Sequence, residues 1–133
     1  AKKMHVGFAL IDKRRPKPNQ AVVVNLIGDL KDKHVIIIDD MIDTAGTICN
    51  AAETAIENGA IDVTCVATHP VLSGESITRL QDSSLSKVIV CDTISVPEEK
   101  LFDKLEIVST AKVFGESIRR IDSGESLSSM FDI

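Results

Sequence analysis

Residues 35–47, VIIIDDMIDTAGT, decide how this chain folds. Four consecutive apolar β-branched residues predict a strand that is buried on both faces of a parallel sheet. The stretch then turns polar, with two aspartates directly after the apolar run and a third ahead of a turn of small residues. Beyond that turn, apolar residues at helical spacing predict a helix that ends at Gly59. Strand, acidic loop and helix in this order are typical of one unit of an α/β domain.

Apolar runs and helical patterns alternate along the rest of the chain as well. Strands are predicted at residues 6–11, 21–26, 34–40, 62–68, 87–91 and 105–108, and helices from residue 47 up to Gly59, at 75–81 and at 111–121. This alternation predicts an α/β fold with a mainly parallel sheet flanked by helices. A length of 133 residues predicts a single domain.

The composition excludes several classes of function. A net charge of −5, with no Trp and no Tyr, argues against a nucleic-acid-binding protein. No apolar run approaches the ~20 residues that a membrane span needs. The three cysteines are far apart and lack CxxC spacing. They are therefore predicted to be buried reduced thiols, which favours a cytoplasmic protein.

The turn after the aspartates has the features of an anion site. In open α/β sheets, ligands bind outside the carboxyl ends of the strands. The start of a helix offers free N–H groups and the positive end of the helix dipole, which suit a phosphate. Gly46 permits a close approach, and Thr44 and Thr47 add hydroxyl donors. The stretch lacks the Lys of a P-loop and the Gly spacing of a dinucleotide fingerprint.

The carboxylates of Asp39, Asp40 and Asp43 cannot share that anion, because like charges repel at short range. They can accept hydrogen bonds from sugar hydroxyls, and they also suit Mg²⁺, which prefers oxygen ligands. A sugar phosphate would satisfy both halves of the stretch. The alternative is that these aspartates only cap a turn or the helix.

A second charged segment lies at residues 13–19, KRRPKPN. It holds four of the fifteen basic residues within five positions. Its two prolines keep it out of a helix or a central strand. A basic, irregular segment of this kind could close as a lid over a polyphosphate, although a solvated surface loop is the alternative.

The histidines do not form a recognisable metal site. No pair has a spacing such as HExxH, so zinc is not expected, and no metal ligand is assigned within this chain. His69 stands at the end of a predicted strand, on the edge where ligands bind, and is a further site candidate.

Taken together, these motifs resemble the ribose-phosphate pyrophosphokinases, also called phosphoribosyl pyrophosphate synthetases. The resemblance runs through VIIIDDMIDTAGT, IDKRRPKPN, ENGA, THPVLSG, VPEEK and GESLSSMF, and spans essentially all 133 residues. It covers less than half of a family member, namely the C-terminal, ribose-5-phosphate-binding domain with a type I phosphoribosyltransferase fold. The resemblance implies transfer of pyrophosphate from MgATP to ribose 5-phosphate, giving phosphoribosyl pyrophosphate and AMP. It also implies a homohexamer that is activated by phosphate and inhibited by ADP.

The resemblance also implies roles for individual residues. Lys13 and Arg15 match the catalytic pair of a mobile basic loop at 13–20, and residues 39–47 match the phosphate and ribose loop. Ser126 and Ser128 resemble residues of a regulatory anion site. The expected ribose 5-phosphate contacts are Arg15, Asp39, Asp40, Asp43, Thr44, Ala45, Gly46 and Thr47.

Two other functions remain open from the sequence. A phosphoribosyltransferase would share the fold and the phosphate loop, but IDKRRPKPN and THPVLSG resemble the synthetase. A non-catalytic regulatory homologue would be expected to have an eroded loop or lid, whereas both are intact here. The ATP-binding segments of the family belong to its N-terminal domain. This chain alone is therefore predicted to be inactive.

Overall fold

The computed structural model describes the backbone of residues 5–14 and 23–131, and the side chains of residues 5–11 and 26–131. Two sheets are present in this part of the chain. The first pairs β1 (Leu10–Arg14) with β2 (Val23–Ile27) in antiparallel fashion. The second is parallel throughout, in the order β3-β4-β5-β6. Its strands are β3 (His34–Ile42), β4 (Asp62–Pro70), β5 (Lys87–Cys91) and β6 (Leu105–Val108).

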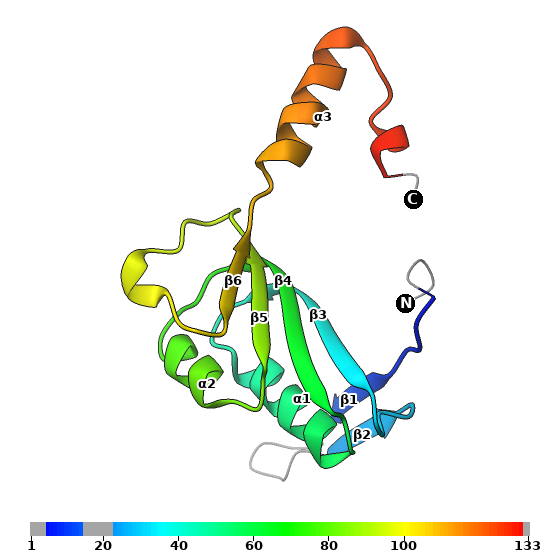
Figure 1. Ribbon diagram of the computed structural model, residues 1–133, viewed down its shortest axis with the longest axis vertical. Helices are drawn as coiled ribbons and strands as arrows, with labels where there is room; N and C mark the ends of the chain where they lie inside the picture. Colours follow the sequence, from blue (N-terminus) through cyan, green and yellow to red (C-terminus); the bar gives the residue numbers. More distant parts are fainter. Residues whose placement is uncertain (1–4, 15–22, 132–133) are drawn as a thin grey trace.

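The helices connect the parallel strands or follow them. They are α1 (Gly46–Glu57), α2 (Ser76–Asp82) and α3 (Ala111–Ser123), with short 3₁₀ turns η2 (Glu98–Lys100) and η3 (Ser128–Met130). The strands follow one another in one direction across the sheet, so right-handed crossovers place α1 and α2 on the same face. Figure 1 shows both helices there, with α3 projecting beyond the end of β6. The α/β fold with a mainly parallel sheet is therefore confirmed.

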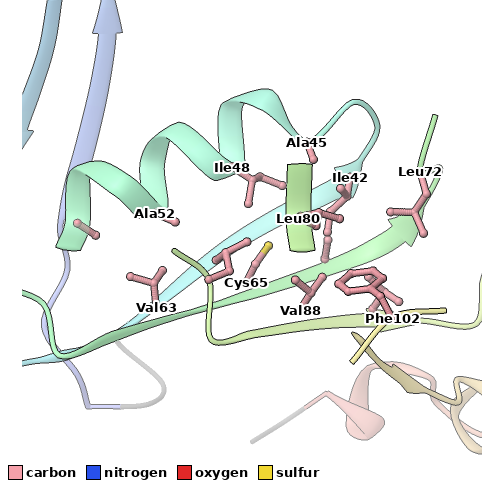
Figure 2. Packing of buried hydrophobic residues seen from close by; sticks show 14 of the residues in the cluster. Ile42, Ala45, Ile48, Ala52, Val63, Cys65, Leu72, Leu80, Val88 and Phe102 are labelled. Atoms are coloured by element: carbon pink, nitrogen blue, oxygen red, sulfur yellow. The ribbon is translucent and has the colours of Figure 1, made fainter. Parts of the chain in front are cut away.

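The hydrophobic core lies between the sheet and these two helices. Alternate residues of β4 and β5 point into it, including Val63 and Val88, because successive side chains of a strand face opposite sides. On α1, Ile48, Ala52 and Ala55 line one face at intervals of four and three residues. Figure 2 shows Ile48 and Ala52 facing the side chains of the strands, with Leu80 of α2 beside them. Burial of this kind is worth about 1.5–3 kcal/mol for each large side chain.

The other face of the sheet is open in the described part of the chain. Ile36 and Ile38 on β3 are 51% and 70% exposed. The prediction that this strand is buried on both faces is therefore wrong. β3 lies at the edge of the sheet, and both packed helices lie on the other face, so Ile36 and Ile38 meet solvent while their neighbours Val35 and Ile37 are half-buried. A continuous apolar run indicates a strand but does not show which of its faces is covered.

Element boundaries follow the predictions closely from β3 onward, and less well before it. The first strand begins at Leu10 instead of residue 6, and it includes Lys13 and Arg14, which were expected to break it. The second strand begins at Val23, and residues 21 and 22 lie outside the described part of the chain. Gly59 does follow the end of α1 with φ +89°, as expected for a residue in that position.

The cysteines are free thiols, but only one is deeply buried. Cys65 lies in the core, where burial raises the pKa of its thiol to about 12. Cys49 and Cys91 are half-buried, so the prediction of three buried thiols is correct for Cys65 alone. Among the helices described, none has both the length and the apolar character to cross a membrane.

Candidate functional site

The turn between β3 and α1 forms the candidate anion site. Ile42 ends the strand in the core, and Ala45, which is 4% exposed, adopts a left-handed conformation with φ +64°. The helix begins at Gly46, and its first main-chain bond runs from the Cys49 N–H to the Ala45 carbonyl at 3.0 Å. The N–H groups of Gly46, Thr47 and Ile48 precede that bond and lack intrahelical acceptors. A Cβ atom added to Gly46 would meet no atom within 4 Å apart from its chain neighbours and its own helix backbone, so the helix start is open to a ligand.

The two aspartates of the DD pair lie inside the strand. Because β3 continues to Ile42, Asp39 and Asp40 precede its end, within a run of exposed residues from Ile38 to Met41. The Asp39 carboxylate accepts the Asp40 N–H at 2.9 Å, and both side chains are exposed. The prediction that both stand together at the strand end is wrong, because the strand is two residues longer than predicted.

Asp43 is tied to a segment that sequence reasoning had not placed in the site. The Ser73 hydroxyl donates to the Asp43 carboxylate, and the Ser73 N–H donates to the Asp43 carbonyl at 3.1 Å. One residue earlier, the Leu72 N–H donates to the Ile42 carbonyl at 2.9 Å. The ammonium group of Lys100 holds the Leu72 carbonyl at 2.7 Å. These hydrogen bonds hold the candidate loop against the turn after β4.

Arg79 is a second residue that sequence reasoning missed. Its guanidinium donates to the Thr44 carbonyl at 3.0 Å and pairs with Glu75 at 3.3 Å. It reaches the loop from α2, thirty-five positions along the chain. The sequence offered no signal for this contact beyond a cation on a predicted helix.

His69 lies at the same edge of the sheet, where β4 runs beside β3 with His69 opposite Met41. Its Nδ1 is 2.9 Å from the Thr93 hydroxyl, and that hydroxyl donates to the Thr68 carbonyl at 2.9 Å. Since the only hydroxyl proton is used there, Nδ1 of His69 donates to the Thr93 hydroxyl. His69 is exposed and remains a candidate for ligand contact.

The basic segment is not brought to the loop by the described residues. The backbone of Lys13 lies in β1, its side chain is not described, and Arg15 lies outside the described part of the chain. The β1–β2 ribbon lies beside the C-terminal end of α1, whereas the candidate loop leads into the other end of that helix (Figures 1 and 2). The role of this segment as a lid stays a prediction.

Ser126 and Ser128 follow α3 in the chain, and Figure 1 shows α3 and the segment after it projecting away from the sheet. Arg120 donates to the Ser126 carbonyl at 2.8 Å and also to the Ser129 hydroxyl. Ser128 opens η3, and both predicted serines are exposed. A cation and several hydroxyls are thus gathered near the C-terminal end of α3.

Fold and loop together define the class: an α/β domain with an acidic turn and a helix start at the carboxyl edge of a parallel sheet. The model of the phosphoribosyl synthetase-associated domain matches residues 6–132. The chain belongs to this family.

Similar proteins carry the name of one enzyme. The chain is 50% identical over 131 residues to a ribose-phosphate pyrophosphokinase of Caldanaerobacter subterraneus, covering 98% of this chain and 42% of the relative. It is 48% identical to that of Clostridium acetobutylicum, covering 98% and 41%. The crystal structure of phosphoribosylpyrophosphate synthetase from Mycobacterium smegmatis superimposes with a TM-score of 0.79 at 38% identity, covering 87% of this chain and 37% of that one. The chain thus spans about two fifths of the length of these relatives.

Proposed function

We propose that this chain is the ribose-5-phosphate-binding domain of a ribose-phosphate pyrophosphokinase. Such an enzyme transfers pyrophosphate from MgATP to the anomeric hydroxyl of ribose 5-phosphate, giving phosphoribosyl pyrophosphate and AMP. The observation that carries the proposal is the turn at residues 43–47. It presents helix-start N–H groups that no described residue pairs with, and threonine hydroxyls, next to a carboxylate at the carboxyl edge of the sheet. The names of similar proteins support the same reaction.

Different groups of the turn are proposed to contact different parts of one ligand. The 5-phosphate binds the N–H groups of Ala45, Gly46 and Thr47 and the hydroxyls of Thr44 and Thr47. Asp43 has one carboxylate oxygen bonded to Ser73, so its other oxygen is available to a sugar hydroxyl. Asp39 and Asp40 are both exposed shortly before this turn, so their carboxylates are available to further hydroxyls of the sugar.

Mg²⁺ would be bound to the protein mainly through the phosphates of the nucleotide. Among the described residues, no group of three or more His, Cys, Asp or Glu could hold a metal ion. The exposed carboxylates of Asp39, Asp40 and Asp43 instead fit an ion that is held mainly by substrate phosphates, with one or two protein oxygens. When bound, Mg²⁺ offsets the negative charge that develops on the phosphate oxygens.

Further roles belong to the same proposal. Lys13 and Arg15 would stabilise charge on the transferring group, and Arg15 would also contact ribose 5-phosphate. Ser126 and Ser128 would form part of a regulatory site for phosphate or ADP. The enzyme would be a cytoplasmic homohexamer that binds neither nucleic acid nor a membrane.

Calorimetric titration of the chain with ribose 5-phosphate tests the central assignment. The wild-type chain should release or absorb binding heat, and Asp43→Ala should weaken binding at least tenfold. Asp103→Ala removes an exposed carboxylate outside the loop and serves as the matched control. Unphosphorylated ribose should bind far more weakly than the phosphate ester. Equal heats from wild type and Asp43→Ala would sink the loop assignment.

A phosphoribosyltransferase is the second candidate function, since it would use the same loop. The two differ in their ligands: the synthetase binds ribose 5-phosphate and ATP, whereas the transferase binds phosphoribosyl pyrophosphate and a base. Tighter binding of phosphoribosyl pyrophosphate together with a purine or pyrimidine base would favour the transferase. Release of AMP is not expected from this chain alone, because ATP is bound by the other part of the proposed enzyme.

A further inference from the structure

The carbonyl groups of the candidate loop are held in two different ways. Those of Ile42, Asp43 and Ala45 each accept a main-chain N–H, from Leu72, Ser73 and Cys49 respectively. The carbonyl of Thr44 is different, because its partner among the described residues is a side chain, the guanidinium of Arg79 at 3.0 Å. One peptide plane of the loop, between residues 44 and 45, therefore depends on one arginine for its orientation.

That orientation decides what the loop offers to an anion. Every described peptide bond is trans, so the Thr44 carbonyl and the Ala45 N–H point in opposite directions. Because the carbonyl points at Arg79 on α2, the N–H points away from α2. Within residues 5–14 and 23–131, no acceptor is paired with this N–H, although Ala45 is buried. A bound phosphate oxygen would pair with this donor.

The backbone preference of Ala45 favours the opposite orientation of the 44–45 peptide. Ala45 has φ +64°, a left-handed conformation that costs an alanine about 1–2 kcal/mol. Rotating the 44–45 plane by half a turn changes φ of Ala45 and ψ of Thr44 by similar angles, and it moves φ of Ala45 to a negative value, outside the left-handed region. The same rotation would exchange the N–H for the carbonyl oxygen on the side where the anion binds. Local preference thus favours the orientation that repels a phosphate.

We propose that Arg79 is a positioning residue, which holds the Thr44–Ala45 peptide so that the Ala45 N–H faces the phosphate of the substrate. This inference rests on the proposed ribose 5-phosphate site. A hydrogen bond from a charged donor to a carbonyl is strong enough to outweigh the strain at Ala45. Arg79 does not touch the phosphate in this role; it acts through the main chain.

A double-mutant cycle between Arg79 and Ala45 tests the proposal by titration with ribose 5-phosphate. Arg79→Ala should weaken binding about 10- to 100-fold, the loss expected for one hydrogen bond from a charged donor. Glycine has no preference against positive φ, so Ala45→Gly should leave the wild-type affinity within a few-fold. In the Arg79→Ala background, however, Ala45→Gly should recover at least threefold of the lost affinity. The Ala45 amide resonance should also shift on ligand binding in the wild type and lose most of that shift in Arg79→Ala.

Two further variants test whether the effect is specific to this cation and whether a cation at this position is needed. Lys87→Ala removes an exposed, ion-paired cation elsewhere and should bind as the wild type does. Arg79→Lys keeps the charge and should bind more tightly than Arg79→Ala. The Arg79 side chain is 45% exposed, so its replacement should preserve the circular dichroism spectrum of the fold.

The outcomes distinguish this inference from the function on which it rests. If the wild type binds ribose 5-phosphate, Asp43→Ala weakens binding and Arg79→Ala does not, the positioning role alone is overturned. If Arg79→Ala weakens binding but Ala45→Gly recovers nothing, Arg79 acts by charge and the orientation argument is wrong. If neither the wild type nor Asp43→Ala binds, the proposed function and this inference fall together.

Discussion

Two helices of nearly equal length illustrate how differently this chain uses an apolar stripe. α1 has 12 residues and buries Ile48, Ala52 and Ala55 against the sheet. α3 has 13 residues and a stripe that contains Val113, Phe114, Ile118 and Ile121, yet all of its residues remain at least partly exposed. Figure 1 shows α1 lying against the strands and α3 standing clear of them.

The difference comes from chain connectivity. α1 joins two neighbouring parallel strands, so the crossover must lay its apolar face on the sheet between them. α3 follows β6, and the described residues after α3 form no strand that would return to the sheet. Its stripe has the same periodicity, but nothing in the described chain fixes a partner for it. Periodicity therefore encodes which face of a helix is apolar, and connectivity determines what that face meets.

The largest effect is expected on the packed side of this comparison. Leu80 of α2 is 0% exposed and lies in the core beside residues of α1 and β4. Leu80→Ala should lower the free energy of unfolding by about 2–5 kcal/mol, through lost burial and the cavity that remains. Urea denaturation followed by circular dichroism measures it. A loss below about 1 kcal/mol would mean that this interface is looser than the structure has it.

A smaller loss is expected where α2 ends. Lys104 donates to the carbonyls of Gln81 and Ser83 at 2.7 and 2.8 Å, and so binds the end of the helix with a positive charge. Lys104→Met keeps the length of the side chain but removes the donor, and should cost about 1–3 kcal/mol. Lys112→Met replaces a lysine on α3 and is the matched control, with an expected change near zero. Equal midpoints in urea for both variants would contradict the capping role.

The sequence was informative about elements because their signals are local. Apolar runs at 62–68, 87–91 and 105–108 became β4, β5 and β6, and helical spacing located all three helices within two residues. It was less informative about burial. The apolar run of β3 looked like a central strand, but β3 lies at the edge of the sheet with an open face. Which strands become neighbours depends on the whole chain, and a window of ten residues does not contain that information.

The candidate site likewise has a part that local sequence predicted and a part that it did not. Residues 43–47 were predicted from local chemistry, namely a turn of small residues, a helix start and an aspartate. Ser73 and Arg79 were missed, because each reaches the loop from thirty or more positions away. Their contacts are made by tertiary structure alone, since serine and arginine on a predicted turn or helix are ordinary surface residues.

The link between β6 and α3 should respond to acid. Asp92 accepts the Ser109 hydroxyl at 2.6 Å, and the hydroxyl and N–H of Thr110 at 2.6 and 2.7 Å. These bonds, Ser109 first, lower the pKa of the carboxyl from 3.8 to about 2. A lowered pKa means that the stabilisation is complete above about pH 4 and is lost as the pH falls toward 2.

The amide resonance of Thr110 measures this titration directly. Its shift should follow a midpoint near pH 2, and in Asp92→Asn the shift should lose that midpoint. Glu116 lies on α3 and Glu125 follows it. The pKa of each carboxyl is also lowered to about 2, and the largest cause in both cases is the hydrogen bond from Arg119. The asparagine variant therefore separates the signal of Asp92 from theirs. A Thr110 midpoint near 3.8 would mean that the carboxyl does not hold the start of α3 in solution.

The smallest effect is expected on the exposed helix. Ile118 of α3 is 67% exposed, so Ile118→Ala removes little buried surface and should change the free energy of unfolding by less than about 0.5 kcal/mol. Alanine also favours the helix slightly, which works against any loss. Urea denaturation at two protein concentrations makes the measurement. Leu80→Ala and Ile118→Ala each shorten one apolar side chain on a helix, so the gap between them measures what a packing partner adds. A loss of 2 kcal/mol at Ile118 would close that gap and show that α3 packs on another surface in solution.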